Sequence, residues 1–148
     1  MGIKIIVENR KASFQYHFID RIEAGLVLTG SEVKSLRDAR ANLGDAYAVI
    51  KNGELFLLNC HISPYAPAAG MNHDPLRTRK LLVHKAQLEK LYGQLREKGL
   101  TLVPTKMYFK EGRAKVELAL AKGKKTFDKR ESIKKRETDR MLRRTLAK

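Results

Sequence analysis

The residues Leu100–Ala121, with the sequence LTLVPTKMYFKEGRAKVELALA, contain two strand-like halves around a Glu-Gly turn at 111–112. From Ala114 onward every second residue is apolar, and charged residues stand between the first of them. Because successive side chains of a strand point to opposite faces, this alternation is typical of a strand with one buried face. The stretch therefore predicts an antiparallel pair of strands, Leu100–Phe109 with Arg113–Ala121.

Two further strand pairs are predicted from turn signals. The dipeptide at 52–53, Asn-Gly, favours a tight hairpin because both residues tolerate positive φ, and it joins Ala46–Lys51 to Glu54–Ile62. An Ala-Gly break at 24–25 separates the strand-like segments Phe14–Ile22 and Leu26–Thr29. Together with the first pair, these segments predict six antiparallel strands.

Two short helices interrupt the strands. Ser31 can cap a helix that runs to about Ala41. A second helix ends before Gly99, because apolar residues recur at i, i+3, i+4 and i+7 in Leu88, Leu91, Tyr92 and Leu95. This spacing predicts that Tyr92 lies in the core.

The predicted fold class is mainly β, with short helices packed on a six-stranded antiparallel barrel of the oligonucleotide-binding type. A chain of 148 residues has room for one such core. We assign residues 1–121 to the barrel domain and residues 122–148 to a basic tail. The tail holds few large apolar residues, so we expect it to be disordered when free.

The charge of the chain predicts a polyanionic partner. Lys and Arg number 31 against 16 Asp and Glu, a net charge of +15, and residues 122–148 alone hold 12 Lys and Arg against 4 Asp and Glu. Nucleic acid is favoured over an anionic membrane, because a peripheral membrane binder usually has an amphipathic helix with Trp or Phe on its apolar face and this chain has no Trp. No apolar run approaches the length of roughly 20 residues that spans a bilayer, so no membrane partner is expected.

One enzymatic alternative is a metal-dependent nuclease. Asp20 followed by the Glu-Val-Lys triplet at 32–34 fits a loose D…E-x-K pattern. The triplet falls at the start of a predicted helix, where residues i and i+2 do not share a face, so the pattern is weak. The four histidines lack helical ligand spacing, the single Cys60 predicts a core residue, and phosphate-binding glycine loops are missing. We therefore predict no metal site and no cofactor.

Basic clusters beside aromatic residues favour RNA as the partner. Lys and Arg pair with phosphates, and aromatic rings stack on unpaired bases. The clusters are Asn9–Lys11, Lys34 with Arg37, Arg77–Lys80 and Gly123–Lys125. The stacking candidates are Tyr16, Tyr65, Tyr92, Tyr108 and Phe127.

Three segments carry a resemblance to a known family. They are Ala24–Arg37 (AGLVLTGSEVKSLR), His73–Leu82 (HDPLRTRKLL) and Gly123–Arg130 (GKKTFDKR), and together they resemble the small protein B (SmpB, SsrA-binding protein) family. The resemblance implies a bacterial, cytoplasmic RNA-binding adaptor that is not an enzyme. Such an adaptor binds the tRNA-like domain of transfer-messenger RNA (tmRNA) and takes it to stalled ribosomes, where trans-translation tags the unfinished peptide.

The resemblance also implies which residues contact each partner. The RNA-binding set is Asn9, Arg10, Glu23, Lys34, Arg37, Arg79, Lys80, Leu82 and His84. The ribosome-directed set, expected to enter the decoding centre and the empty mRNA channel as a helix, is Gly123, Lys124, Lys125, Phe127, Asp128, Lys129, Arg130, Ile133, Lys134, Lys135 and Arg136. We expect a monomer.

Three alternatives stay open at this stage. Glu23 could instead be a turn residue before the Ala-Gly break. The family often has His where this chain has Phe127, and Asn also occurs where it has His84, so stacking and hydrogen bonding are the chemistry that these positions share with the family. A general RNA-binding or ribosome-associated protein remains the alternative function, with the nuclease as a less favoured one.

Overall fold

The computed structural model describes residues 2–65, 72–97 and 99–123 of the chain. In chain order the elements of these residues are β1 (Ile3–Glu8), α1 (Arg10–Gln15), β2 (Tyr16–Leu26), α2 (Gly30–Arg37), β3 (Ala41–Asn42), β4 (Tyr47–Lys51), β5 (Glu54–Leu58), β6 (His61–Ile62), β7 (Arg79–Leu82), α3 (Lys85–Leu95), β8 (Leu100–Lys110) and β9 (Arg113–Gly123). The fold is mainly β with three short helices in the described part of the chain, as predicted.

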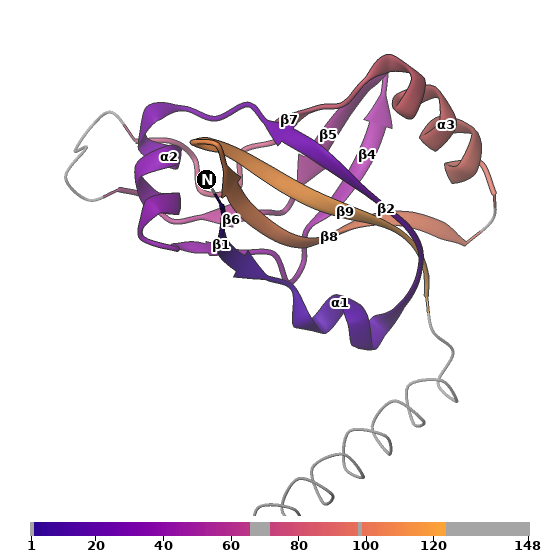
Figure 1. Ribbon diagram of the computed structural model, residues 1–148, viewed down its shortest axis with the longest axis horizontal. Coiled ribbons are helices and arrows are strands. Elements are labelled where there is room, and N and C mark those ends of the chain that lie inside the picture. The colour runs from indigo at the N-terminus through magenta and orange to yellow at the C-terminus, as the bar shows by residue number, and fades with distance from the viewer. Residues whose placement is uncertain (1, 66–71, 98, 124–148) are drawn as a thin grey trace, which may run out of the picture.

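Six strands close into a ring. Each of β8, β4, β5, β7, β2 and β9 pairs antiparallel with the next, and β9 returns to β8. β1 adds to the outside of this ring by pairing with β8, and β3 pairs with β6 in a separate two-stranded sheet. Figure 1 shows β2, β9 and β8 crossing the barrel, with α1, α2 and α3 at three different sides of it. The prediction of a six-stranded barrel with packed helices is confirmed.

One predicted strand pair is wrong. β2 runs from Tyr16 through the Ala-Gly pair to Leu26 without a turn. Ala24 is buried in the barrel, and Gly25 pairs with Leu82 on one side and Lys115 on the other. Partners on both edges keep the chain extended where the sequence alone suggested a break.

The sixth strand of the ring is β7, which the sequence analysis assigned to no element. It alternates buried Arg79 and Leu81 with exposed Lys80 and Leu82. Arginine is rarely buried, so the cluster Arg77–Lys80 was interpreted as exposed and the alternation of a strand was not recognised in it. β1, α1 and β3 were not predicted from the sequence either.

The helices differ from prediction in two respects. α2 ends at Arg37 rather than near Ala41, because Ala39 takes a positive φ of 56° that a helix does not accommodate. α3 buries Leu91, whereas Tyr92 is 55% exposed, so the prediction of Tyr92 in the core is wrong. Gly99 follows α3 at a φ of 87°, consistent with the predicted stop signal.

The main core fills the barrel interior. Its fully buried members include Leu57, Leu102, Met107, Val116 and Leu118. Cys60 also lies there, as predicted, and burial raises the pKa of its thiol to about 11. None of the helices within the described residues has the length and apolarity needed to cross a membrane.

Candidate nucleic-acid interface

Three residues of the predicted RNA-binding set meet at one surface cavity. Glu23 from β2, Leu82 from β7 and His84 at the start of α3 line a cavity of about 320 Å³. The other lining residues are Gly25, Val83, Gln87 and Lys115. The cavity therefore combines a carboxylate, an imidazole, an amide and an ammonium group around an apolar wall.

The strand register builds this cavity. Ala24 and Leu81 point into the barrel, so their neighbours Glu23, Gly25 and Leu82 lie on its outer face. Gly25 pairs with Leu82, which brings the two strands together at the cavity. Leu82 is 53% exposed there, a large apolar side chain without a core to cover it. An exposed apolar wall beside polar groups suits the flat face of a nucleobase.

Glu23 is held as a charged acceptor. Tyr108 donates its hydroxyl hydrogen bond to Oε2 of Glu23, and Nζ of Lys110 lies 3.5 Å from the same oxygen. The hydrogen bond from Tyr108 lowers the pKa of Glu23, partial burial opposes this, and the charges of Lys110 and Lys115 lower it further. Both contacts involve Oε2, so among the described residues Oε1 has no protein donor. Its free lone pairs can accept hydrogen bonds from base or sugar donors.

The turn alternative for Glu23 is wrong. Glu23 lies in the middle of β2 and pairs across the sheet with Glu117 of β9. Tyr108 is also not a stacking platform, because the residue is only 4% exposed and its hydroxyl is bonded to Glu23. The hydrogen bond between the two residues fixes the carboxylate of Glu23 against the barrel.

Lys34, Arg37 and Lys80 are the exposed cations of the predicted set on α2 and β7. Nζ of Lys34 lies 5.7 Å from the ring centroid of Tyr65, a cation–π distance. Lys80 is on the same outer face of β7 as Leu82, and its Nζ lies 3.1 Å from Oε1 of Glu54. Surface pairs of this kind are weak, so Lys80 can exchange Glu54 for a phosphate at little cost.

Arg79 lies in the interior rather than on the predicted basic surface. Its side chain is fully buried and its Nε donates to Oε2 of Glu32. The guanidinium therefore has no route to an RNA phosphate in this structure. The physical reason is the strand alternation, which places Arg79 and Lys80 on opposite faces of β7.

Asn9 and Arg10 lie apart from the cavity, at α1 on another side of the barrel (Figure 1). Asn9 is 8% exposed and serves the fold: its Oδ1 accepts from the Ala12 amide, and its Nδ2 donates to the carbonyls of Leu43 and Pro104 at 3.1 Å and 2.9 Å. Arg10 is exposed at the first position of α1.

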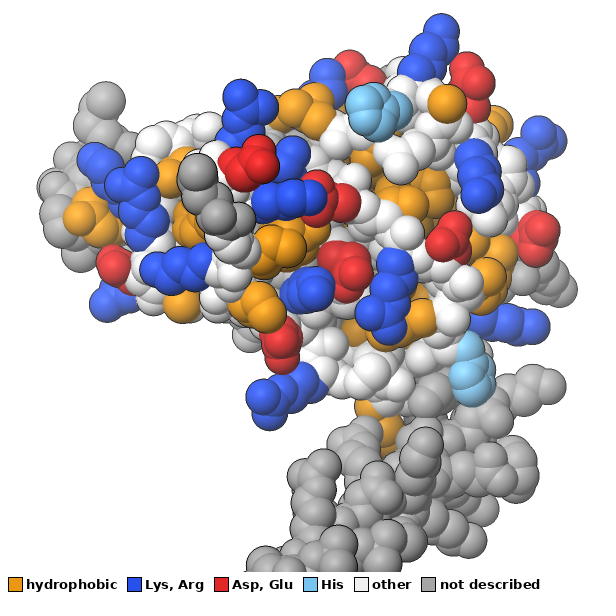
Figure 2. Space-filling view, viewed as in Figure 1, with side chains coloured by type: hydrophobic (Ala, Val, Ile, Leu, Met, Phe, Trp, Pro, Cys, Tyr) orange, Lys and Arg blue, Asp and Glu red, His pale blue; other side chains and the backbone are white. Residues whose placement is uncertain are grey.

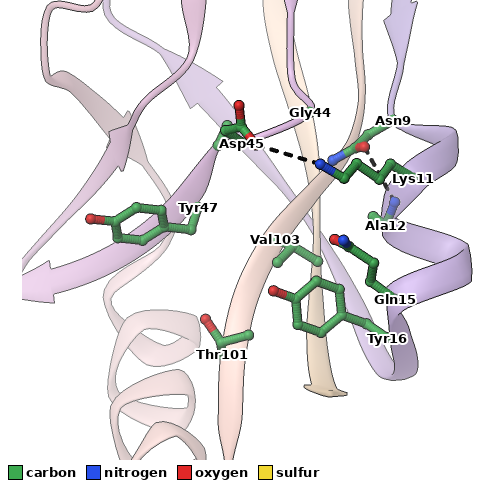
Figure 3. Close-up of a pocket in the computed structure, with 11 residues that line it drawn as sticks. Asn9, Lys11, Ala12, Gln15, Tyr16, Gly44, Asp45, Tyr47, Thr101 and Val103 are labelled. Atoms are coloured by element: carbon green, nitrogen blue, oxygen red, sulfur yellow. Dashed lines mark hydrogen bonds and ion pairs between the residues drawn. The ribbon is translucent and has the colours of Figure 1, made fainter. Parts of the chain in front are cut away.

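A second cavity, of about 270 Å³, opens beside α1 (Figure 3). The rings of Tyr16 and Tyr47 lie on opposite sides of Thr101 in this view, and Nζ of Lys11 lies 3.6 Å from Oδ1 of Asp45. Asn9 is at its rim. The predicted RNA-binding set thus divides between α1, α2, the Glu23 cavity and β7, where Lys80 is exposed and Arg79 is buried.

Positive charge is spread over the visible face instead of forming one block. Figure 2 shows Lys and Arg side chains across this face, interleaved with Asp and Glu and with apolar patches. Such a surface attracts a polyanion, but dispersed charge carries no sequence information by itself.

The nuclease pattern does not form a site. Glu32 is fully buried, with Arg77 and Arg79 bonded to its carboxylate, and Lys34 faces outward from the same helix. Asp20 is exposed and accepts a hydrogen bond from the amide of Arg21 at 2.8 Å. Across residues 2–65, 72–97 and 99–123, no three His, Cys, Asp or Glu side chains gather closely enough to hold a metal ion.

Of the ribosome-directed set, the described residues include Gly123 alone. It is exposed at the end of β9, where it pairs with Tyr16. β9 thus continues two residues beyond the predicted end of the barrel domain at 121. The other members, from Lys124 to Arg136, and the tail assignment itself lie outside the described residues.

The positions of four residues around Glu23 were not predicted from the sequence. Lys115 was visible as a charged residue on the outer face of a predicted strand, but nothing in the sequence linked it to Glu23. Gln87 and Lys110 gave no signal either, and Tyr108 was predicted as a stacking residue rather than as a partner of Glu23. These contacts depend on how the ring of strands closes.

The chain is similar to known proteins along nearly its whole length. The family model described as SmpB protein matches residues 6–148. An SsrA-binding protein of Enterococcus faecalis is 58% identical over 143 residues, which are 97% of this chain and 93% of that protein. An SsrA-binding protein of Geobacter sulfurreducens is 56% identical over 146 residues, covering 99% and 95% of the two chains.

A solved structure shares the fold as well. It is described as "tmRNA-SmpB: a journey to the center of the bacterial ribosome", and one of its chains is 47% identical to this one. The match has a TM-score of 0.71 and covers 86% of this chain and 93% of that chain.

Proposed function

The chain belongs to the SmpB protein family, and we propose that it is an RNA-binding adaptor that binds the tRNA-like domain of tmRNA and delivers it to stalled ribosomes for trans-translation. The observation that carries this function is the family match across residues 6–148, with relatives above 50% identity over nearly the full length. The protein is not an enzyme. A ribosomal partner supports a location in the cytoplasm.

The Glu23 cavity supports recognition of a folded RNA. Sequence-specific RNA binding usually targets unpaired bases that stack on side chains and present their polar edges. Leu82 offers a face for such a base, while Glu23 accepts hydrogen bonds from amino or imino groups and His84 adds a ring nitrogen. A carboxylate repels phosphates, so its presence here favours readout of a base or a ribose over contact with the backbone.

The cations outside the cavity supply affinity without selectivity. Lys34, Arg37 and Lys80 are exposed and can each neutralise a phosphate. This division between positioning by phosphates and selection by base contacts is common in nucleic-acid recognition. A general RNA-binding protein would need the cations but not the Glu23 cavity.

The basic tail carries the ribosomal half of the proposal. Residues 122–148 hold 12 Lys and Arg, and a helix of the residues after β9, 124–148, would extend ~40 Å at 1.5 Å per residue. We assign it to the decoding centre and the empty mRNA channel, with Phe127 stacking on a base. Body and tail would then bind two different RNAs.

A truncation tests this division of labour. Removal of residues 131–148 leaves every described residue in place, so binding to the tRNA-like domain should stay within about tenfold of the full chain, or ~1.4 kcal/mol. Peptide tagging on stalled ribosomes should collapse. Both are measured on the same preparations, by RNA titration and by tagging in a reconstituted translation system. Loss of RNA binding on truncation, or tagging that persists without the tail, would contradict the proposal.

A further inference from the structure

A buried ion-pair cluster connects α2 to β7. Glu32 and Arg79 are both fully buried, and Nε of Arg79 donates to Oε2 of Glu32. Arg77, which is partly exposed, donates from Nη2 to Oε1 of Glu32 at 2.6 Å. Both carboxylate oxygens are therefore bonded to arginines that come from a segment far along the chain.

The same guanidinium reaches two further segments. Nη1 of Arg79 donates to the carbonyl of Cys60 at 2.6 Å, and Nη2 donates to the carbonyl of Pro75 at 3.2 Å. Glu32 also accepts from the amide of Thr29, at 2.8 Å, at the start of α2. One ion pair thus joins the start of α2, the chain after β5, the approach to β7, and β7 itself.

Most of the remaining buried side of α2 is polar as well. Oγ of Ser31 lies 2.8 Å from Nδ1 of His73, and Oγ of Ser35 donates to the carbonyl of Ser63 at 2.6 Å. Leu36 is the buried apolar residue of this helix. Hydrogen bonds fix direction and distance, whereas an apolar contact allows sliding, so α2 is held in one orientation on the barrel.

The opposite side of α2 carries exposed Lys34 and Arg37, which lie three residues apart on one helix face. Their positions in space follow the orientation of the helix. Arg77 also donates to the carbonyl of Val27 at 3.3 Å, and the amide of Val27 donates to the carbonyl of Lys80 at 3.1 Å. The cluster therefore relates the cations of α2 to Lys80 and Leu82 on the outer face of β7.

We propose that the Glu32–Arg79 pair, together with Arg77, is an interior clamp that positions Lys34 and Arg37 for the RNA, and that Arg79 acts in RNA binding as a positioning residue without touching the RNA. The inference rests on the proposed RNA-binding function and assigns a role to buried groups that this function does not otherwise use.

Energetics favour a positioning role over a purely stabilising one. Because both charges lose their hydration, a buried ion pair adds little net stability to the fold. Apolar residues of similar volume at the same positions often stabilise a protein equally well or better. What the charged pair adds is geometry, because a carboxylate with three donors has one favourable arrangement. The clamp is therefore expected to determine the positions of the exposed Lys34 and Arg37 side chains.

A double-mutant cycle tests the clamp. The variants are Glu32→Gln, Arg37→Ala and their combination, in the full chain, with titration of the tRNA-like domain of tmRNA at one fixed salt concentration. Arg37→Ala should weaken binding about fivefold in the wild type but less than about twofold in the Glu32→Gln background. Circular dichroism first establishes that each variant is folded.

His84→Ala supplies the matched control. His84 lines the Glu23 cavity and has no bond to the clamp, so its effect on affinity should be the same with Glu32 and with Gln at position 32. A general loss of structure in Glu32→Gln would change the effect of His84→Ala as well as the effect of Arg37→Ala. Loss of the Arg37 effect alone is the signature of positioning.

Several outcomes would overturn the inference. It fails if Arg37→Ala keeps its full effect in folded Glu32→Gln protein, or if Arg37→Ala has no effect in the wild type. If Glu32→Gln does not fold, the cycle is run with Arg77→Gln, which leaves the Glu32–Arg79 bond in place, and additive effects there overturn the inference as well. If the wild-type chain binds this RNA and the effects of the two substitutions are additive, the clamp is contradicted but the proposed function is not. If the wild-type chain does not bind this RNA, the proposed function itself is contradicted.

Discussion

Glu23 and Glu32 are two glutamates with lowered pKa values and opposite uses. Glu32 is fully buried, with donors from Arg77, Arg79 and the Thr29 amide on its two oxygens. Glu23 is at the surface, with Tyr108 and Lys110 on one oxygen. The difference teaches that the number of protein donors decides whether a carboxylate serves the fold or a ligand. Glu32 has little acceptor capacity left, while Oε1 of Glu23 accepts no hydrogen bond from the described residues and is available to a ligand.

β7 shows the same contrast between neighbours. Arg79 and Lys80 are adjacent in the sequence, yet the first is fully buried and the second is exposed. Substitutions in the interior region around Arg79 should therefore change stability and the placement of the α2 cations, whereas substitutions at the surface region around Glu23 should change RNA binding with little effect on stability. Four substitutions or conditions separate these regions.

The largest effect is expected for Arg79→Ala. It leaves Glu32 buried with one arginine fewer, so the free energy of unfolding should fall by ~3–5 kcal/mol. Lys80→Ala on the same strand is the control and should cost no more than ~1 kcal/mol, because its pair with Glu54 is exposed. Urea unfolding of both variants measures the difference. Equal losses would mean that Arg79 is not the centre of the interior cluster.

Acid should weaken the interior region next. Burial acts to raise the pKa of Glu32, but hydrogen bonds from Arg77, the Thr29 amide and Arg79 outweigh burial and hold it at about 2, below the ordinary 4.5. The charged form is therefore favoured in the folded state, and its stability contribution is complete above pH ~4.5 and lost as the pH falls toward ~2.

The loss is on the order of 3 kcal/mol, at 1.36 kcal/mol per pKa unit. The measurement is the unfolding free energy of the wild type and of Glu32→Gln as a function of pH. The gap between the two proteins should narrow below pH ~4.5. A gap that stays constant down to pH ~2 would show that the Glu32 charge does not couple to folding.

At the surface, Glu23→Ala should weaken binding of the tRNA-like domain by ~1–3 kcal/mol, although it makes the protein more positive. Asp45→Ala is the matched control, since it removes the same charge from an exposed position beside α1, away from the cavity. It should leave affinity unchanged or slightly raise it. If both variants bind more tightly, the Glu23 cavity reads no donor on the RNA and general electrostatics explain binding.

The smallest effect is expected for Tyr108→Phe, which removes the hydroxyl that orients Glu23. The pKa of Glu23 should rise toward its ordinary value, and RNA affinity should fall by ~1 kcal/mol. Tyr92→Phe removes a hydroxyl from an exposed ring outside the cavity and serves as the control. RNA titration compares the two, and identical affinities would remove Tyr108 from the site.

Local signals predicted much of this fold. The Asn-Gly and Glu-Gly turns identify two hairpins because a tight turn depends on its own residues, and both turns adopt the expected positive φ. β7 escaped prediction because its inward position holds an arginine whose carboxylate partner, Glu32, is distant in the sequence. The Ala-Gly pair in β2 was misread as a break because strand partners on both edges override local preference.

The site was predictable in membership but not in geometry. The resemblance named Glu23, Leu82 and His84, and the pairing of Gly25 with Leu82 brings them to one cavity. It named Arg79 as well, but a list of residues does not show which face of a strand each occupies. The bond from Tyr108 to Glu23 joins positions that come together only when the ring of strands closes.

The most direct test of the central claim is to sequence the RNA that copurifies with the full chain from its own cells after a high-salt wash. A tmRNA adaptor should enrich one structured RNA, with tmRNA dominating the sequenced reads, and Glu23→Ala should reduce that enrichment more than Asp45→Ala does. A broad sample of cellular RNA in proportion to abundance, unaffected by Glu23→Ala, would contradict the account and identify the chain as a general RNA-binding protein.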